Sequence, residues 1–286
     1  MQRMPDTPLE LQAGDLRLAL RADLGGAIAG LWRGATPVLR STEPADLTAV
    51  RGSACFPLVP YSNRLGHRRF QWQGQDHTTA ANFADSPHSL HGVAWQRPWD
   101  VVSASTSAAE LAYRHRPDAD WPFAFDVRQR FDLAPGRLRL QLALTNRAEQ
   151  PQPVGLGWHP YFPQRPGARL RIDVAQRWDS DASQLPTHRV AQSGIDGEVA
   201  GMAYDHCFGG WQGAALITDE QMSLRLTSSL PYLVVFTPNT QAFFCVEPVS
   251  HVSNAIQMTD PAAQGLRTLA PGATFDAWLQ LDIEGN

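Results

Sequence analysis

The run Asp126–Leu144, DVRQRFDLAPGRLRLQLAL, decides the fold class of this 286-residue chain. Apolar and polar residues alternate from Leu138 to Leu144, and Asp126–Asp132 alternates in the same way. A period of two is typical of β-strands with one buried face. Pro135 and Gly136 separate the two runs, which predicts a turn and therefore an antiparallel hairpin.

The same alternation recurs along the chain, while helical periodicity is scarce. It is present at Leu224–Thr227 and Ala277–Ile283, and at Leu9–Leu20 with a break at Gly14–Asp15. Thr106–Tyr113 has the length of two helical turns, but we predict a strand there. Pro163–Tyr204 is polar with scattered Gly and Pro, which predicts loops between short strands. We therefore predict an all-β fold, a large antiparallel β-sandwich, in a single domain over residues 1–286.

Composition excludes several classes of protein. Acidic residues outnumber basic ones by 28 to 24, and the formal net charge is −4. Proteins that bind nucleic acid or anionic membranes usually carry a basic excess, so we expect neither partner. All 24 basic residues are Arg. The lack of Lys excludes Schiff-base aldolases, pyridoxal-phosphate enzymes and the P-loop lysine.

The cysteines and the N-terminal segment bear on compartment. Cys55, Cys207 and Cys245 are far apart and form no C-x-x-C motif, so we predict neither a zinc ribbon nor a disulfide framework. This fits a cytoplasmic protein. Met1–Asp15 has no continuous apolar stretch, so we expect no signal peptide. No run of about 18 apolar residues exists that would span a membrane.

A first polar segment, Pro57–Phe70, reads PLVPYSNRLGHRRF. Its prolines restrict the backbone, and Asn63 and Arg64 follow in what we predict to be a loop. The guanidinium of Arg is a fixed fork of donors that suits paired hydroxyls or a carboxylate. Asn63 and Arg64 are therefore candidates to bind a ligand in a cleft. A solvated turn is the alternative interpretation.

A second polar segment, Ser86–Trp99, contains His88, His91, Gly92 and Trp95. The H-x-x-H spacing raises the possibility of a metal, but two histidines without Cys or carboxylate ligands nearby are a weak signal. A ligand site is the better interpretation. Gly allows a ligand to approach the backbone, and Trp offers an apolar face to a sugar ring.

A third segment, Gly155–Pro163, reads GLGWHPYFP. Pro160 favours an extended backbone at His159. In a strand, Tyr161 then shares a face with His159 while Trp158 lies on the opposite face. A histidine among aromatic residues is often a satisfied core residue, and that interpretation stays open beside the catalytic one.

Glu247 stands at the end of an apolar strand, in the sequence AFFCVEPVS of residues 242–250. A Glu in that position is seldom only a solvated charge. Partial burial raises the pKa of a carboxylate and makes it a better base at neutral pH. Asp205 and His206, in YDHCF, are a similar but weaker signal. One His and one Glu, each before a Pro, are suited to act as a general acid–base pair.

The order of these motifs resembles the aldose 1-epimerase (galactose mutarotase-like) family, over nearly the whole chain. Two positions depart from the usual family pattern, since Val93 follows His91–Gly92 and Trp158 precedes His159. The motifs that carry the resemblance are Asn63-Arg64, His91-Gly92, Gly157-Trp158-His159-Pro160-Tyr161-Phe162, Asp205-His206 and Glu247-Pro248.

The resemblance implies a β-supersandwich and an isomerase that interconverts the α and β anomers of a free aldohexose. It implies that His159 protonates the ring oxygen, that Glu247 is the base and that His91 is a second catalytic histidine. It further implies that Arg64 and Asp205 bind the sugar, and we add Asn63, Trp95 and Tyr161 to the candidate binding residues. We expect no metal, no cofactor and only a small-molecule sugar as partner, in a monomer or homodimer.

Three other functions stay open. A glycosidase needs two carboxylates, which Asp205 and Glu247 could supply, but His159 would then have no role. A non-catalytic carbohydrate-binding domain would not need both His159 and Glu247. A hexose-6-phosphate 1-epimerase would need an Arg cluster for phosphate. Arg68 and Arg69 follow Arg64 closely, but a strand would place them on opposite faces.

Overall fold

The computed structural model describes residues 9–84 and 86–285, and nearly all of its regular structure is β. Within these residues the helices are short 3₁₀ turns, namely Val50–Gly52 (η1), Gly66–Arg68 (η2), Ala94–Gln96 (η3), Val199–Gly201 (η4) and Ala255–Gln257 (η5). The prediction of an all-β antiparallel fold is therefore confirmed. The first eight residues of the segment predicted to lack a signal peptide lie outside the described residues.

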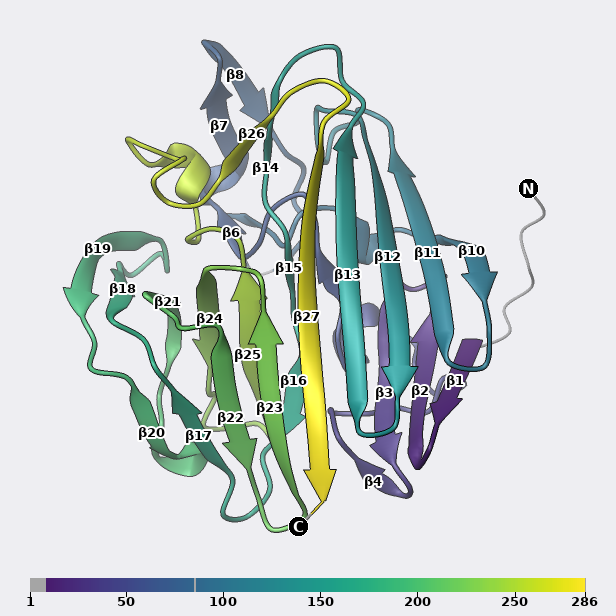
Figure 1. Ribbon diagram of the computed structural model, residues 1–286. Coiled ribbons are helices and arrows are strands. Elements are labelled where there is room, and N and C mark those ends of the chain that lie inside the picture. Colours follow the sequence, from purple (N-terminus) through teal and green to yellow (C-terminus); the bar gives the residue numbers. More distant parts are fainter. Residues whose placement is uncertain (1–8, 85, 286) are drawn as a thin grey trace.

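The larger sheet has nine antiparallel strands, and its longest strand, β27 (Thr274–Gly285), runs down its middle between β13 and β23 (Figure 1). In spatial order the strands are β10 (Asp100–Ala104), β11 (Ala108–His115), β12 (Phe125–Ala134), β13 (Arg137–Asn146), β27, β23 (Met222–Ser228), β22 (Ala214–Thr218), β17 (Arg169–Ile172) and β20 (Ile195–Glu198).

The hairpin predicted from the sequence is β12–β13. Its register pairs Phe131 with Leu140, and Gly136 occupies the left-handed region in the turn, with φ of 69°. Leu138, Leu140, Leu142 and Leu144 are all buried, as the alternation requires. The strand expected at Thr106–Tyr113 is also present, as β11.

The second large sheet has eight strands. Its order is β19 (Pro186–Ala191), β18 (Gln176–Ser180), β21 (Asp205–Gly209), β24 (Tyr232–Phe236), β25 (Phe243–Val249), β15 (Gly157–Trp158) and β5 (Pro57–Leu58), and β16 (Tyr161–Pro163) also pairs with β25. The polar stretch 163–204 thus forms short strands joined by loops, as predicted. The first polar segment supplies β5 to this sheet, and the third supplies β15 and β16.

Smaller sheets complete the molecule. Four strands at the N-terminal side are β1 (Leu9–Ala13), β2 (Leu16–Arg21), β3 (Ala27–Arg33) and β4 (Thr36–Pro37), with the expected break at Gly14–Asp15. The two-stranded pairs are β14 (Gln152–Val154) with β26 (Arg267–Leu269), β6 (Arg64–Leu65) with β9 (Ser89–Leu90), and β7 (Arg69–Trp72) with β8 (Gln75–Thr78).

The main core lies between the two large sheets, and β25 contributes to it with only one of its faces. Phe244 and Val246 belong to the main core, together with leucines of β13. Cys245 and Val249 point the other way, into a second apolar cluster that contains Phe56, Trp95 and Tyr161. The eight-stranded sheet is therefore covered on both faces, and the second cluster is the floor of the candidate site.

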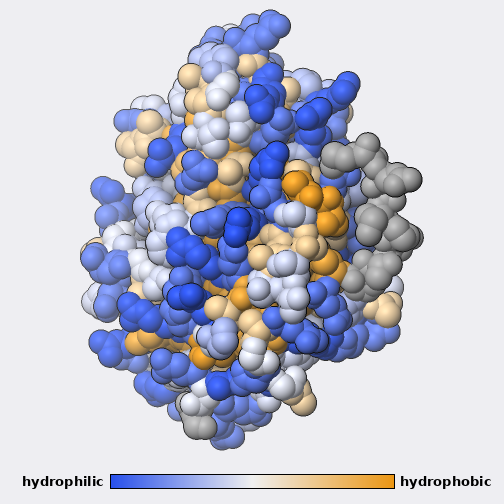
Figure 2. Space-filling model, turned by 45° about the vertical axis from the view of Figure 1, so that its right-hand side comes forward, coloured by the Kyte–Doolittle hydropathy of each residue, from blue (hydrophilic) through white to orange (hydrophobic). Residues whose placement is uncertain are grey.

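The face of the molecule shown in Figure 2 is mostly hydrophilic, with apolar areas between polar ones. Among the described residues, Val102 is the one large apolar side chain classed as exposed. None of the helices in the described part of the chain has the length and apolar character needed to cross a membrane.

Replacing Leu142 by Ala tests the packing between the sheets. Leu142 is 1% exposed, so the change should lower the free energy of unfolding by about 2–5 kcal/mol, since it removes apolar burial and leaves a cavity. The control is Gln141→Ala, whose side chain lies on the exposed face of the same strand and should change stability by less than about 0.5 kcal/mol. Equal losses in urea unfolding would contradict the assigned faces of β13.

Candidate active site

Glu247 lies on the second face of the eight-stranded sheet, opposite the main core. Its neighbour Val246 points into that core, so the alternation of β25 turns the carboxylate to the other side. Glu247 is 3% exposed, and its Oε1 lies 3.4 Å from Nε2 of His159, which is 8% exposed. The structure thus brings together the two residues predicted as the acid–base pair, 88 positions apart in the sequence.

His159 is held by backbone and by aromatic rings. Its backbone N–H donates to the carbonyl of Phe56 at 3.0 Å. Its ring stacks on Phe56, at a centroid distance of 4.8 Å, and on Tyr161, at 4.5 Å. Tyr161 shares the face of His159 and Trp158 is buried in the main core on the other side, as predicted. The stack fixes the plane of the imidazole.

His91 reaches the pair from a left-handed turn. The backbone φ is 64° at His91 and 70° at Gly92, and the His91 N–H donates to the carbonyl of Asn63 at 2.8 Å. The ring of His91 meets that of His159 edge to face, at 5.2 Å. A Cβ on Gly92 would lie 2.1 Å from the carbonyl oxygen of Val59, so only glycine allows this close approach.

Arg64 and Asp205 stand beside the pair, and Asn63 orients the arginine. Arg64 Nη2 lies 3.4 Å from Asp205 Oδ2 and donates to Gln184 Oε1 at 2.5 Å. Asn63 Oδ1 accepts from Arg64 Nη1 at 3.1 Å and from the Ser253 hydroxyl at 2.9 Å. The amide of Asn63 thus serves the guanidinium directly, and Asp205, which is partly exposed, lies at the outer side of the site.

Trp95 and His88 lie differently from the roles that the sequence suggested for them, a face for a sugar ring and one half of an H-x-x-H metal pair. Trp95 is 2% exposed and stacks on Phe56 at 5.4 Å. It supports the site from beneath and offers no open platform to a sugar ring. His88 uses both ring nitrogens elsewhere, with Nδ1 accepting from the His67 N–H and Nε2 bonded to the Ser183 carbonyl. The H-x-x-H pair therefore does not converge on one ion.

Burial dominates the electrostatics of the site. Desolvation raises the pKa of Glu247 well above its ordinary value, the charge of Asp205 raises it further, and Arg64 opposes both. Desolvation lowers the pKa of His159 well below its ordinary value, with smaller contributions from His91 and Arg40. It also lowers the pKa of His91 to about 3. All three effects favour the uncharged form of each group.

The uncharged pair, protonated Glu247 beside neutral His159, is therefore favoured over the ion pair in the free protein. The pKa of His159 is lowered because its ring is buried against Phe56 and Tyr161. Within the described residues, Glu247 Oε2, His159 Nδ1 and His91 Nδ1 are buried without a hydrogen-bond partner. Leaving a buried polar atom without a hydrogen-bond partner costs free energy. A polar ligand that supplied partners to these three atoms would therefore bind most favourably there.

Sequence reasoning missed three residues that shape this site. Phe56 is one wall of the stack around His159. The Arg40 guanidinium lies 3.6 Å from the Tyr161 ring centroid. Asn82 brackets His91, because its Oδ1 accepts from the Leu90 N–H at 2.8 Å and its Nδ2 donates to the carbonyls of Leu90 and Gly92. The only local signal was Phe56 beside Pro57, and nothing near Arg40 or Asn82 marked them.

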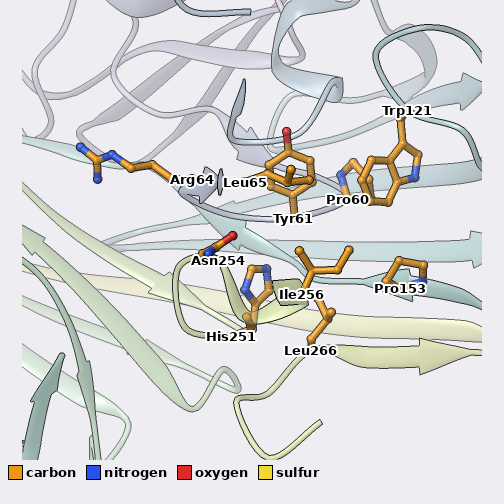
Figure 3. A pocket seen from close by; sticks show the side chains of 11 residues that line it. Pro60, Tyr61, Arg64, Leu65, Trp121, Pro153, His251, Asn254, Ile256 and Leu266 are labelled. Carbon is orange, nitrogen blue, oxygen red and sulfur yellow. The ribbon is translucent and has the colours of Figure 1, made fainter. Parts of the chain in front are cut away.

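A small cavity of about 10 Å³ lies between the loop that contains Tyr61 and the loop that contains His251 (Figure 3). Tyr61 and His251 lie on opposite sides of it, and Arg64 points away from it. His251 Nε2 accepts from the Ser62 N–H at 3.1 Å while Nδ1 is bonded to the Val252 carbonyl. Burial lowers the pKa of His251 to about 4, so this ring is a neutral brace at physiological pH.

The site thus combines a buried His–Glu pair with a second histidine and an Arg–Asp pair on one face of a β-sandwich. The aldose 1-epimerase family model matches residues 8–282. The chain therefore belongs to the aldose 1-epimerase family.

Individual proteins are similar to this chain over nearly its whole length. The chain is 31% identical to the uncharacterized protein YphB of Escherichia coli K12 over 96% of its own length and 98% of the relative. A crystal structure of a candidate aldose 1-epimerase from the same organism superposes with a TM-score of 0.89 at 30% identity, covering 98% of this chain and 99% of the other. A galactose 1-epimerase from Lactobacillus acidophilus shares the fold, with a TM-score of 0.80 at 14% identity and coverage of 100% and 97%.

Asn82→Ala tests the bracket around His91. The variant leaves Leu90 and Gly92 without their side-chain partner and should lose about 1–3 kcal/mol of unfolding free energy in urea. Asn82→Asp keeps the acceptor and should lose less. The control is Gln96→Ala, since Gln96 donates to the backbone of Asn82 from the exposed side. An Asn82→Ala protein as stable as Gln96→Ala would show that the left-handed turn does not depend on this amide.

Proposed function

We propose that this protein is an aldose 1-epimerase that interconverts the α and β anomers of a free aldohexose by acid–base catalysed ring opening and closure. One observation carries the proposal: the buried contact of 3.4 Å between His159 Nε2 and Glu247 Oε1. Anomer exchange needs a proton removed from one oxygen and delivered to another on the same carbon. A rigid His–Glu pair can do both across one short distance.

In the proposed reaction Glu247 accepts the proton of the C1 hydroxyl while protonated His159 gives one to the ring oxygen. The bond between C1 and the ring oxygen breaks and leaves a free aldehyde. Rotation about C1–C2 presents the other face of the carbonyl, and reclosure with the two residues in exchanged roles gives the other anomer. No electrons are transferred, and the pair returns to its starting protonation state.

The proton inventory of the pair supports this scheme. At neutral pH, protonated Glu247 and neutral His159 hold one proton between them, and the working tautomer has that proton on His159. Transfer across the contact creates it without exchange with solvent. The charge of Arg64 opposes the rise of the Glu247 pKa, so Arg64 favours the carboxylate of the working tautomer. Because the two groups titrate together, the pair has macroscopic pKa values.

The remaining candidates divide between orientation and binding. Neutral His91, whose ring meets His159 at 5.2 Å, would hydrogen-bond a sugar oxygen near the reacting carbon. Arg64 and Asp205 offer donors and acceptors to ring hydroxyls. Asn63 holds Arg64, Tyr161 packs against His159, and Trp95 supports Phe56. We infer a cytoplasmic location from the three free, buried cysteines, which suit a reducing compartment.

Glu247→Gln tests the proposed base. The amide keeps the shape and can hydrogen-bond a hydroxyl, but it cannot accept the C1 proton. Sugar affinity should change little, while catalysed anomer exchange measured by NMR should fall by at least ~10², the low end for a positioned base. The matched control is Glu220→Gln, an exposed carboxylate, which should keep parental activity. Exchange near the parental rate in Glu247→Gln would exclude Glu247 as the base.

The same assay, run over free and 6-phosphorylated aldoses, separates the alternative functions. Faster exchange of only the 6-phosphates would favour a hexose-6-phosphate 1-epimerase. Sugar binding without any acceleration would favour a carbohydrate-binding domain. Release of a reducing sugar from a glycoside would favour a glycosidase. Faster exchange of unmodified aldohexoses supports the proposal.

The pH dependence of kcat/KM should be a broad bell. Below the pKa of His159 both groups are protonated and no base is available, and above the pKa of Glu247 no acid remains. Burial moves the first pKa down and the second up, so the one-proton form spans a wide range. We expect kcat/KM to be nearly constant around neutral pH, since both pKa values move away from it. A limb centred near 6.5, the ordinary value for His, would contradict the burial of His159.

A further inference from the structure

The acid–base pair has a third neighbour, which the proposed reaction does not use. Cys245 stands two residues before Glu247 on β25, so both side chains point to the same face of the sheet. One ligand atom from each of His159, Cys245 and Glu247 can be chosen so that all three lie within 4.8 Å of one another. Each of the three residues is more than nine-tenths buried.

We propose that His159, Cys245 and Glu247 form a binding site for a thiophilic divalent cation such as Zn²⁺, and that the bound cation blocks the acid–base pair. Imidazole nitrogen, thiolate sulfur and carboxylate oxygen are the three ligand types of protein zinc sites. Three protein ligands with one remaining position form the arrangement of zinc sites that stay open to water or a small ligand.

The geometry requires only small movements. The centre of a triangle with sides of 4.8 Å lies about 2.8 Å from each corner, while zinc bonds are about 2.0–2.3 Å long. The ligand atoms therefore need to close in by at most about 0.5–0.8 Å. The contact between His159 Nε2 and Glu247 Oε1, at 3.4 Å, already has a separation that two ligands of one tetrahedral ion can adopt.

The charge balance also favours a divalent ion. The thiol of Cys245 and the carboxyl of Glu247 each release one proton to solvent as the Zn–S and Zn–O bonds form, and neutral His159 donates its lone pair. Two anionic ligands then neutralise the charge of Zn²⁺, so the filled site adds no net charge to the protein interior. Glu247 Oε2, which has no partner among the described residues, is available as a further oxygen ligand.

The donor set predicts which ions bind. Mg²⁺ and Ca²⁺ prefer oxygen ligands only, whereas sulfur and imidazole select Zn²⁺ and related ions. Because the cation would hold the two atoms that exchange the catalytic proton, its effect on anomer exchange is inhibition. The site is therefore distinct from a catalytic metal centre, and chelators should not lower activity.

The test uses Co²⁺ as a spectroscopic probe and Cys245→Ser as the critical variant. Co²⁺ bound to a thiolate gives an ultraviolet charge-transfer band, which exposed ion pairs such as His206–Asp179 cannot produce. The parent should show the band, and Zn²⁺ but not Mg²⁺ should abolish it. Cys207→Ser is the matched control, since Cys207 is also free and buried beside this sheet face but lies outside the ligand group.

We expect Cys245→Ser to lose the band and to bind Zn²⁺ at least ~10-fold more weakly, since losing even an outer partner of a metal ligand costs that much, while Cys207→Ser resembles the parent. Cys245→Ala, with its fold checked by thermal unfolding, covers a failure of the serine variant to fold. A band that survives in Cys245→Ser, or a parent that shows none, would overturn the proposal.

Inhibition is measured separately from binding. Zn²⁺ should slow anomer exchange by the parent, and EDTA should restore it. For Cys245→Ser, measured relative to that variant's own activity without metal, the inhibitory Zn²⁺ concentration should be raised at least ~10-fold. Zn²⁺ that binds at Cys245 without slowing exchange would overturn the blocking role. If the protein catalyses no exchange at all, the proposed function fails while the Co²⁺ spectrum still decides the metal site.

Discussion

Strand β25 is buried on both of its faces, and this constraint governs the arrangement around it. One face carries Phe244 and Val246 into the main core, and the other carries Cys245 and Glu247 toward the site. A carboxylate placed there loses most of its hydration, and an isolated buried charge is too costly to persist. Burial therefore favours the uncharged form of Glu247 in the free protein, and this follows from the same strand alternation that builds the core.

The second face of the sheet is covered by loops that depend on one another. His91, Asn63 and Asn254 all occupy the left-handed region, with φ between 55° and 64°. Each is fixed from outside its own loop: Asn63 accepts from the His91 N–H, and the Asn254 N–H donates to the carbonyl of Arg64. Strained backbone persists only where neighbours determine it, and it often gathers at functional sites. The strain here lies in the loops that hold His91 and Arg64.

The features that could be predicted from the sequence are those that depend on neighbouring residues in the chain. Alternation identified the β12–β13 hairpin, and the proline after His159 correctly pointed to a strand end, since β15 stops at Trp158. The prediction that Glu247 ends its strand was wrong, because β25 continues through Pro248 to Val249, both paired with β24. Contacts between distant segments were not predictable: no local signal marks Arg40, and Trp95 resembles a sugar platform although it lies beneath Phe56. The lowered pKa of His159 was not predictable either, because desolvation depends on the residues from distant segments that the fold packs against the ring.

In the proposed mechanism, burial makes the charged form of each partner more reactive, but it also lowers the population of that charged form. An imidazolium with a lowered pKa is a stronger acid and a carboxylate with a raised pKa is a stronger base, but every tenfold fall in the population of the charged form corresponds to about 1.4 kcal/mol. Moving one proton from Glu247 to His159 keeps the net charge of the pair constant. The free-energy cost is therefore that of separating two opposite charges over a short distance, and not that of burying an isolated charge. A sugar hydroxyl that donates to Glu247 Oε2, an atom without a partner among the described residues, lowers that cost further. The working tautomer is then populated mainly when a sugar is bound, which ties proton transfer to the presence of substrate.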